Sequence, residues 1–245
     1  MRVELKKGAW LIGDAHDGLS RGSLFALLKV LDSKKQLPSQ LFFLGDMFDF
    51  LTDAPYLLDF YKKEIEVIDS LSQKTELFYL EGNHDFGIKR VFLHAKVFEN
   101  KEQPLYLNAG KKVVAMSHGD IFLPFITQKS LLFLRGKHFL KMATFLDGAL
   151  NFKLSKAILN SQKDKSLYYK IPNFKELISK KIENYRADII IEGHYHQDSF
   201  LKFRDREYWN LNSYAVSQKI YEVEFKNGSL SLNSLSFSSI MSQKE

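Results

Sequence analysis

The sequence predicts an α/β fold with parallel strands and an inserted helical segment. Three observations lead to this fold class. Short apolar runs alternate with helical patterns in the first third of the chain, five such runs end at a glycine followed by a polar residue, and the stretch from about residue 122 to 181 is mostly helical in pattern. Strands that alternate with helices are typical of a parallel sheet, and ligands gather at the carboxyl ends of its strands.

The five apolar runs are short enough to be buried strands, and the glycine at the end of each marks where the strand stops. They cover residues 10–13, 41–45, 76–82, 112–119 and 186–193. The helical patterns between the first three runs cover residues 23–33 and 56–71. We therefore expect strands and helices to alternate over the first 82 residues.

Residues 200–237 alternate between apolar and polar side chains, which is the pattern of strands with one buried face. Asn227-Gly228 indicates a hairpin turn, and Asp205 indicates a second turn. We expect these C-terminal strands to complete a second sheet that packs on the first.

The segment from about residue 122 to 181 differs from its surroundings because it is rich in aromatic and basic residues and lacks strand signals. It lies between His118 and His194, which end two predicted strands. We therefore predict a helical insert that leans over or beside the active site. Its apolar faces can pack on each other and on the sheets, and such packing leaves room for a groove that binds acyl chains beside it. Without a repeat or linker, residues 1–245 are expected to form one domain with this insert.

Composition limits the chemistry that a site can use. Of the 245 residues, 45% are hydrophobic and 26% are charged, which is ordinary for a globular protein. Cysteine is absent, so a metal site has to use oxygen and imidazole donors. The formal charge of +6 suits an anionic substrate or an anionic membrane surface, although a basic protein without a specific partner has the same balance.

The first residues contain no long apolar run, so a secretory signal is not expected. No stretch approaches the roughly 18 uninterrupted apolar residues of a membrane span. A cytoplasmic location is expected, and basic amphipathic helices in the insert allow peripheral association with the inner membrane. The sequence does not predict the oligomeric state.

Every predicted strand end carries side chains that can bind a metal ion. The seven candidate ligands are Asp14, His16, Asp46, Asn83, His118, His194 and His196. Each motif alone is also a common turn or surface-loop sequence. Their joint occurrence at successive strand ends is hard to explain by packing and favours a metal site. Oxygen and nitrogen donors suit Mn²⁺, with Fe, Zn or Co as alternatives.

A pair of divalent ions held by these residues is suited to phosphoester hydrolysis. Asp46 has two carboxylate oxygens and can bridge two ions. Two ions close together polarise a phosphoryl group, lower the pKa of a water between them and orient it for in-line attack. His84 is the candidate catalytic residue because it can donate a proton or a hydrogen bond to the leaving oxygen.

The order of these motifs resembles the calcineurin-like metallophosphoesterase family over roughly residues 9 to 215. The motifs are Asp14-x-His16, Gly45-Asp46-x-x-Asp49, Gly82-Asn83-His84-Asp85, His118 and Gly193-His194-x-His196. The resemblance implies a four-layer α/β/β/α sandwich with a helical insert.

The same resemblance implies roles for the candidate residues by position. One metal ion would be held by Asp14, His16, Asp46 and His196, and the other by Asp46, Asn83, His118 and His194. His84 matches the family's catalytic histidine. Asp49 and Asp85 are expected to be supporting or structural residues.

Within that family the chain is similar to the bacterial UDP-2,3-diacylglucosamine pyrophosphohydrolases of lipid A biosynthesis. The shared features are the length, a helical insert before Gly-His-x-His, and the sequences GDMF at 45–48, GN at 82–83, DF at 85–86 and HGD at 118–120. The resemblance implies hydrolysis of the diphosphate of UDP-2,3-diacylglucosamine to UMP and lipid X. Lys165, Asn173 and Arg135 are expected to bind this lipid-nucleotide substrate.

Two features depart from that subfamily. It typically carries Arg where this chain has His84, and it usually has an acidic cluster where this chain has the apolar residues 121–125. Another nucleotide or phosphodiester substrate is therefore an alternative, and a non-catalytic scaffold of the same fold is a further one. No nucleic-acid partner is expected, because the basic residues are scattered among apolar helical positions.

Overall fold

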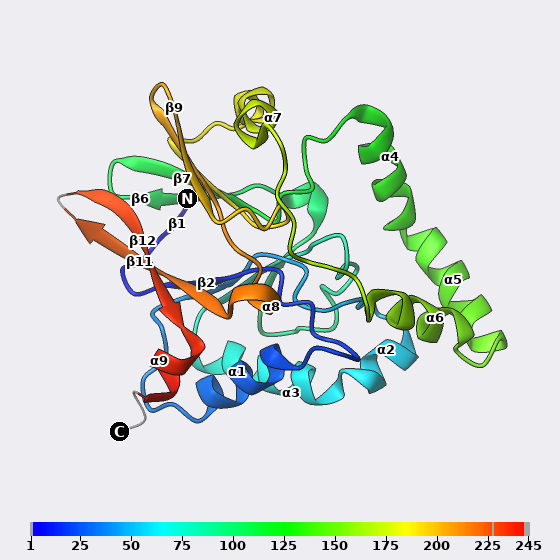
Figure 1. The fold of residues 1–245 in the computed structure, drawn as a ribbon. Coiled ribbons are helices and arrows are strands. Elements are labelled where there is room, and N and C mark those ends of the chain that lie inside the picture. Colours follow the sequence, from blue (N-terminus) through cyan, green and yellow to red (C-terminus); the bar gives the residue numbers. More distant parts are fainter. Residues whose placement is uncertain (1, 227, 243–245) are drawn as a thin grey trace.

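The computed structural model describes residues 2–226 and 228–242, and two six-stranded sheets form its centre (Figure 1). In spatial order, the first sheet contains β12 (Ser229–Ser236), β11 (Lys219–Lys226), β2 (Trp10–Ile12), β3 (Leu41–Phe43), β4 (Leu77–Leu80) and β5 (Lys96–Phe98). The second contains β1 (Val3–Glu4), β6 (Leu105–Ala109), β7 (Lys112–Ser117), β8 (Ile189–Glu192), β10 (Arg206–Asn210) and β9 (Ser199–Phe203).

All five predicted strands are present, but they are divided between the two sheets. β2, β3 and β4 are parallel neighbours in the first sheet, and β7 and β8 are parallel neighbours in the second. The C-terminal strands complete the second sheet only in part. β9 and β10 extend it next to β8, whereas β11 and β12 extend the first sheet next to β2. An alternating pattern indicates a strand but does not indicate which sheet edge accepts it.

One predicted turn is confirmed, and the other is flanked by paired strands. Arg204 and Asp205 form the turn between β9 and β10, where Arg204 has a φ of 50°. β11 and β12 pair antiparallel as far as Lys226 and Ser229, as a hairpin requires. Asn227 itself lies outside the described residues.

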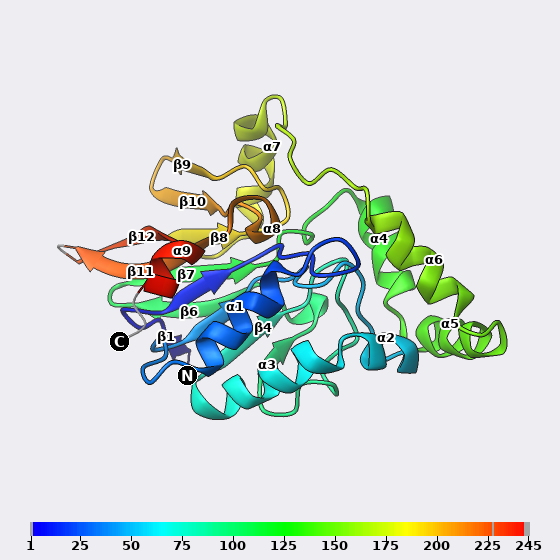
Figure 2. The same ribbon diagram turned by 60° about the horizontal axis from the view of Figure 1, so that its bottom comes forward.

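Helices cover the outer faces of both sheets, which gives four layers in the order α/β/β/α (Figure 2). Against the first sheet lie α1 (Ser23–Asp32), α2 (Pro55–Phe60), α3 (Lys62–Lys74), α8 (Tyr214–Ser217) and α9 (Phe237–Ser242). Against the second lie α7 (Phe174–Lys181) and the 3-10 helix η2 (Ile182–Asn184). A further 3-10 helix, η1 (Asn100–Glu102), precedes β6. The predicted four-layer sandwich is confirmed.

The central strands are apolar on both faces because each face is buried in a different core. In β3, Leu41 and Phe43 pack with the helices, whereas Phe42 packs between the sheets. Phe42 stacks on Phe78 of β4 with ring centroids 4.6 Å apart. Side chains that alternate along one strand therefore fill two cores, and the rigid strand ends carry the loops of the site.

The region predicted as one helix at residues 56–71 contains two helices, α2 and α3, which meet at Tyr61. The buried Tyr61 ring packs against Phe48, with ring centroids 4.7 Å apart, and its hydroxyl donates to the Asp17 carbonyl. Tyr61, at the break, therefore connects the helical layer to the loops that follow β2 and β3.

The inserted segment begins with three helices that extend away from the sandwich, α4 (Phe125–Leu134), α5 (Lys137–Ala149) and α6 (Lys153–Gln162) (Figure 1). Every residue of α4 is at least partly exposed. The buried Asp147 carboxylate at the end of α5 accepts hydrogen bonds from the backbone N–H groups of Leu154 and Ser155, which caps α6.

The last helix of the predicted insert, α7, has a different position. It packs on the second sheet through Ile178 and therefore belongs to the outer layer of the sandwich. Residues 163–173 connect α6 to α7 and pass beside the loop after β8, where the Leu167 carbonyl lies 2.9 Å from His196 Nδ1. Within the described part of the chain, none of the helices is long and apolar enough to cross a bilayer.

Candidate metal centre

The seven predicted ligands follow strands of both sheets. From the first sheet come Asp14, His16, Asp46 and Asn83, and from the second come His118, His194 and His196. Three groups of donor atoms each lie within 4.8 Å of one another: Asp14 with His16 and His196, His16 with Asp46 and His84, and Asp46 with His118 and His194. Asn83 Oδ1 lies 3.2 Å from His118 Nε2. The structure therefore brings all seven residues together.

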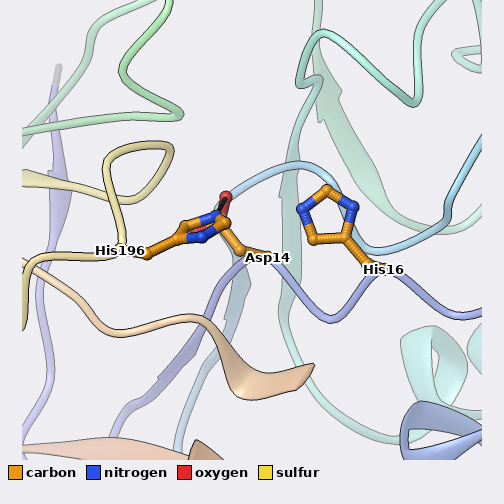
Figure 3. Close-up of side chains that lie close together, drawn as sticks. All are labelled: Asp14, His16 and His196. Atoms are coloured by element: carbon orange, nitrogen blue, oxygen red, sulfur yellow. Dashed lines mark ion pairs between the residues drawn. The ribbon is translucent and has the colours of Figure 1, made fainter. Parts of the chain in front are cut away.

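The two aspartates lie between histidines from different strands. Asp14 Oδ1 lies 3.1 Å from His196 Nε2, and Figure 3 shows this carboxylate beside the His196 ring with His16 next to them. Asp46 Oδ2 lies 3.9 Å from His16 Nε2 and 3.4 Å from His118 Nε2. Asp46 is therefore the carboxylate shared between two groups of donors.

Five of the predicted ligands have a left-handed backbone conformation. They are Asp14 (φ 54°), His16 (φ 45°), Asp46 (φ 51°), His194 (φ 64°) and His196 (φ 54°). Residues other than glycine rarely adopt positive φ, and each case costs about 1–3 kcal/mol. So many strained residues at one place indicate that the fold holds these side chains in a required geometry at the expense of local stability.

Two glycines allow the loops to approach the aspartates closely. A Cβ atom on Gly82 would lie 2.2 Å from Asp46 Oδ1, and one on Gly193 would lie 2.4 Å from Asp14 Oδ2. Both distances are far shorter than a van der Waals contact. The Gly-Asn and Gly-His pairs that follow β4 and β8 are therefore explained by crowding around the two carboxylates.

Backbone carbonyls orient two of the histidine rings. His118 Nδ1 lies 2.8 Å from the Leu44 carbonyl oxygen, and His196 Nδ1 lies 2.9 Å from the Leu167 carbonyl oxygen. Because a carbonyl only accepts hydrogen bonds, both Nδ1 atoms carry the proton and both Nε2 atoms face the carboxylates. A histidine that binds a metal ion is usually held in this way.

Burial and neighbouring charges set the ionisation of the carboxyls and imidazoles in opposite senses. Burial disfavours ionised Asp46, but the histidines around it, His118 first, hold its pKa well below the usual range. Burial likewise opposes charge on His118, but Asp46 raises the His118 pKa well above its usual value. In the same way, His196 lowers the pKa of the buried Asp14, and Asp14 raises the pKa of the buried His196. Burial lowers the pKa of His16 to about 3 and that of His194 to about 4, so these two rings are neutral.

The donor set fits divalent metal ions. Two ionised carboxylates, four imidazoles and an amide oxygen converge in a mostly buried space, where unpaired charge is costly. His16 Nδ1 and Asp49 Oδ2 are buried and have no hydrogen-bond partner among residues 2–226 and 228–242. Oxygen and imidazole donors in this mixture suit Mn, Fe, Co or Zn ions.

A family model described as calcineurin-like phosphoesterase matches residues 9–198, which include all seven converging donors. The chain belongs to the calcineurin-like phosphoesterase family. It is therefore a metal-dependent phosphoesterase, as the motif order predicted.

Curated relatives of this phosphoesterase carry a more specific name. The UDP-2,3-diacylglucosamine hydrolase of Wigglesworthia glossinidia brevipalpis is 24% identical over 217 residues, which cover 80% of this chain and 84% of the relative. The enzyme of the same name from Shewanella baltica is 25% identical over 197 residues, covering 76% and 80% of the two chains. Among solved structures, a predicted phosphoesterase from Streptococcus pneumoniae aligns with a TM-score of 0.45 and 15% identity, covering 96% of this chain and 91% of the other.

His84 lies at the rim of the phosphoesterase site. Its backbone N–H donates to Asp46 Oδ1 at 2.8 Å, and its ring Nδ1 lies 2.7 Å from the Asp49 carbonyl oxygen. Nε2 faces the other way and lies 3.2 Å from Lys165 Nζ. The ring is therefore held at both nitrogens, next to the predicted ligand His16 at a centroid distance of 5.0 Å.

The three predicted substrate-binding residues lie in different places. Lys165 contacts His84 and is beside the site. Arg135 is largely buried, forms an ion pair with Asp120 and donates to the Gly82 carbonyl at 3.0 Å. Asn173 is exposed at the start of α7, where its carbonyl accepts helix N–H groups.

The expectation that Asp49 and Asp85 support the site agrees with their contacts. Asp85 accepts hydrogen bonds from the backbone N–H groups of Asp46, Met47 and Gly82, and so joins the loops after β3 and β4. Asp49 forms an ion pair with Arg21 and holds His84 through its carbonyl.

Several supporting residues were not predicted from the sequence. Gln103 Oε1 accepts from the His118 N–H at 2.8 Å, and the Ser213 hydroxyl donates to the Asp14 carbonyl at 2.6 Å. Arg21 was missed in the same way. They are common polar residue types outside the ligand motifs, so no spacing in the sequence pointed to them.

Proposed function

We propose that this phosphoesterase hydrolyses the diphosphate of UDP-2,3-diacylglucosamine and releases UMP and lipid X, a step of lipid A biosynthesis. The convergence of the seven donors around Asp14 and Asp46 carries the assignment of the reaction class. The substrate assignment is supported by the relatives named UDP-2,3-diacylglucosamine hydrolase, which align with most of the chain.

We assign the donors to two divalent ions, with Mn²⁺ as the first candidate and Fe, Zn or Co as alternatives. The first ion would be held by Asp14, His16, Asp46 and His196, and the second by Asp46, Asn83, His118 and His194. When bound, such a pair polarises a phosphoryl group and increases the acidity of a water molecule. The carbonyls of Leu44 and Leu167 keep His118 and His196 in the required tautomer.

We assign His84 the role of the catalytic residue at the leaving group. The Asp49 carbonyl holds Nδ1, so Nε2 is the nitrogen that faces Lys165. A substrate oxygen that replaces this contact would receive a hydrogen bond and positive charge from the Lys165 ammonium. When the ring also carries a proton at Nε2, the same oxygen would receive a hydrogen bond or that proton from His84. Such stabilisation of developing negative charge is the main contribution of residues at phosphoryl-transfer sites.

A cavity of about 1000 Å³ supports a substrate with acyl chains. Its walls include the apolar side chains of Leu132, Leu140 and Phe145 and the basic side chains of Lys137 and Lys141. Arg135 also lines it and reaches the Gly82 carbonyl, so the cavity lies against the loop that carries Asn83. Burial of each CH₂ group contributes about 0.8 kcal/mol, so such walls favour a lipid.

The insert also presents an apolar and basic surface to solvent, and we infer that it rests on an anionic membrane. On α4 and α5, Phe125, Ile126 and Phe145 are each more than 70% exposed, beside Lys129 and Lys141. Apolar side chains next to lysines are typical of helices that lie in a membrane interface. This assignment places residues 1–245 in one cytoplasmic domain whose insert, about residues 122–181, contacts the inner membrane.

The substrate proposal is tested with purified protein, Mn²⁺ and UDP-2,3-diacylglucosamine, with UMP release measured by chromatography. We expect metal-dependent release of UMP and lipid X in equal amounts. If an aryl phosphodiester is hydrolysed while the lipid nucleotide is not, the substrate assignment is wrong and the reaction class stands.

The ligand assignment is tested with Asp46→Ala. Loss of the shared carboxylate should reduce metal content and lower hydrolysis by more than about a hundredfold, because even residues that only orient a ligand are worth about 10- to 100-fold. Circular dichroism controls for folding. Full turnover in a folded Asp46→Ala protein would refute the proposed centre.

A second candidate function is hydrolysis of another nucleotide or phosphodiester. His84 favours it, because the lipid-nucleotide subfamily that the sequence resembles typically has Arg at this position. A panel of nucleoside diphosphate esters, assayed beside UDP-2,3-diacylglucosamine, separates the two by their kcat/KM values.

A further inference from the structure

We propose that Arg21 is a positioning residue that fastens the end of the insert to the metal-ligand loop and thereby places Lys165 at His84. This inference rests on the proposed function, because it concerns the arrangement of the same site. Arg21 lies between β2 and α1, and its guanidinium reaches the site through the hydrogen bonds described below.

The Arg21 guanidinium joins three separate parts of the chain. Its Nε donates to the His16 carbonyl at 3.1 Å. His16 lies in the loop of the predicted metal ligands that follows β2. The Arg21 Nη2 donates to the Gln162 carbonyl at 2.9 Å and to Asp49 Oδ1 at 2.6 Å. The guanidinium is mostly buried and the Asp49 carboxylate fully so, which strengthens the ion pair relative to one in water.

The contact with Gln162 caps the last helix of the projecting insert. α6 ends at Gln162, and the carbonyls at a helix end have no partner within the helix. Arg21 satisfies the Gln162 carbonyl, and the Ser20 hydroxyl donates to the Lys163 carbonyl at 2.8 Å. A cation is also favoured here by the helix dipole. Ser20 and Arg21 therefore form a docking point for α6.

The docking point determines where the next residues lie. Lys165 Nζ reaches His84 Nε2 at 3.2 Å, and the Leu167 carbonyl reaches His196 Nδ1 at 2.9 Å. Helices α4 and α5 expose most of their residues, whereas α6 buries Leu159 in the core on the helix side of the first sheet. Arg21 therefore fixes the end of α6 together with Leu159. With the chain fastened at Gln162, Lys165 is held three residues away from a fixed point. Release of that point would let the ammonium group leave His84.

Asp49 extends the effect of Arg21 to the other side of His84. The Asp49 carboxylate binds Arg21, and its carbonyl holds His84 Nδ1 at 2.7 Å. One guanidinium thus supports both nitrogens of the His84 ring. It acts on Nδ1 through Asp49, and on Nε2 through the segment from Gln162 to Lys165.

The test is a double-mutant cycle with Arg21→Met and Lys165→Ala, using the metal-loaded enzyme and an aryl phosphodiester. We expect each single variant to lower kcat by about tenfold or more, as for loss of a charge-assisted hydrogen bond. The double variant should be no slower than the slower single variant, because both changes remove the same contact. Lys163→Ala is the matched control, since only its backbone carbonyl is used. Additive effects, or an unchanged kcat in Arg21→Met, would overturn the proposal.

A second measurement does not depend on activity. Hydrogen exchange of the amides of residues 163–167, followed by mass spectrometry, should be about tenfold faster or more in Arg21→Met and faster to a lesser degree in Ser20→Ala, with α1 unchanged. If the enzyme is inactive on every phosphoester, this result still stands and only the proposed function fails. If Arg21→Met does not fold, the exchange rates of residues 163–167 are measured in Ser20→Ala instead. Wild-type exchange of this segment in the folded variants would refute the docking role.

Discussion

Two histidines of the centre carry protons that a metal ion has to displace. Asp46 raises the pKa of His118 and Asp14 raises that of His196, in each case against the effect of burial. Below these raised pKa values both rings are protonated in the metal-free protein, and a protonated imidazole cannot bind a metal ion. Apparent Mn²⁺ affinity should therefore rise with pH up to the raised pKa values and fall as the solution is acidified.

Titration calorimetry at several pH values, in two buffers of different ionisation enthalpy, measures both the affinity and the protons released. We expect proton release on binding near neutral pH. His138→Gln, a change on the insert helix α5 away from the donors, should leave the profile unchanged. An affinity that does not depend on pH, without proton release, would contradict the assignment of His118 and His196 as ligands.

His84 should affect turnover far more than it affects metal content. His84→Gln removes the imidazole at the proposed leaving-group position, and an acid–base group of this kind is worth about 10²- to 10⁴-fold in rate. We expect kcat to fall within that range while metal content, measured by mass spectrometry of the eluted ions, stays near wild type. His94→Gln is the control, because His94 is an exposed histidine paired with Asp69. A loss of metal equal to the loss of rate would make His84 a ligand instead.

At this scale the sequence revealed the donors but not the residues that support them. Asp46 and Asn83 could be predicted because each follows a glycine at a strand end. Gln103 and Ser213 could not, because their partners are backbone atoms of distant loops. Arg21 could not either, because its partner Asp49 lies 28 residues along the chain and nothing in the spacing marks the pair. A backbone partner places no constraint on residue spacing, so these contacts exist only in the folded chain.

A buried ion pair joins α7 to the end of β8, two residues before the predicted ligand His194. Lys181 Nζ lies 2.8 Å from Glu192 Oε1 and donates to the Gly119 carbonyl, next to the predicted ligand His118. The Tyr208 hydroxyl donates to the other oxygen of Glu192 at 2.7 Å. Despite the burial of Glu192, Lys181 holds its pKa below the usual value. The network therefore fixes both His loops of the second sheet.

Lys181→Met should reduce the free energy of unfolding by about 3–5 kcal/mol, because it leaves the Glu192 charge buried without its partner. The measurement is urea unfolding of the metal-free protein. Adding Glu192→Gln to Lys181→Met should recover part of the loss, since the uncompensated charge is then removed. Lys180→Met is the control, because that neighbouring lysine is exposed. Equal stability of Lys181→Met and wild type would show that the pair contributes nothing.

The helices and strands were predicted best where the apolar residues recur with a single spacing, either that of a helix or that of a strand. Residues 23–33 were expected to be helical, and α1 covers Ser23–Asp32. The pattern at 56–71 did not reveal the break at Tyr61, because a buried tyrosine fits a helical pattern equally well. The pairing of β11 with β2 was not predictable either, since strand pairing over such a distance depends on which edge is free.

The whole molecule has an uneven surface, with its exposed apolar residues concentrated on the insert. Phe133 and Phe145 are 68% and 75% exposed, and α4 and α5 lie at the opposite end of the molecule from α9 in Figure 1. If this end rests on a membrane, full burial of each phenylalanine contributes about 1.5–3 kcal/mol.

The double variant Phe133→Ser, Phe145→Ser should therefore bind vesicles that contain anionic phosphatidylglycerol at least about tenfold more weakly. Co-sedimentation at two salt concentrations measures this, and binding should also weaken as salt screens the lysines. Met241→Ser on α9 is the control, being an exposed apolar residue far from the insert. Unchanged binding of the double variant would exclude the insert as the contact surface.

Each of the two proposed ions would be held by donors from both sheets. Asp14 and Asp46 come from the loops of one sheet, and His118 and His196 come from the loops of the other. A bound cation would then cross-link the loops of the two sheets. When the free metal concentration is about a thousand times the dissociation constant, binding stabilises the folded state by about 4 kcal/mol. Chelation should lower Tm as well as stop catalysis, and starvation for metal would shorten the lifetime of the protein itself.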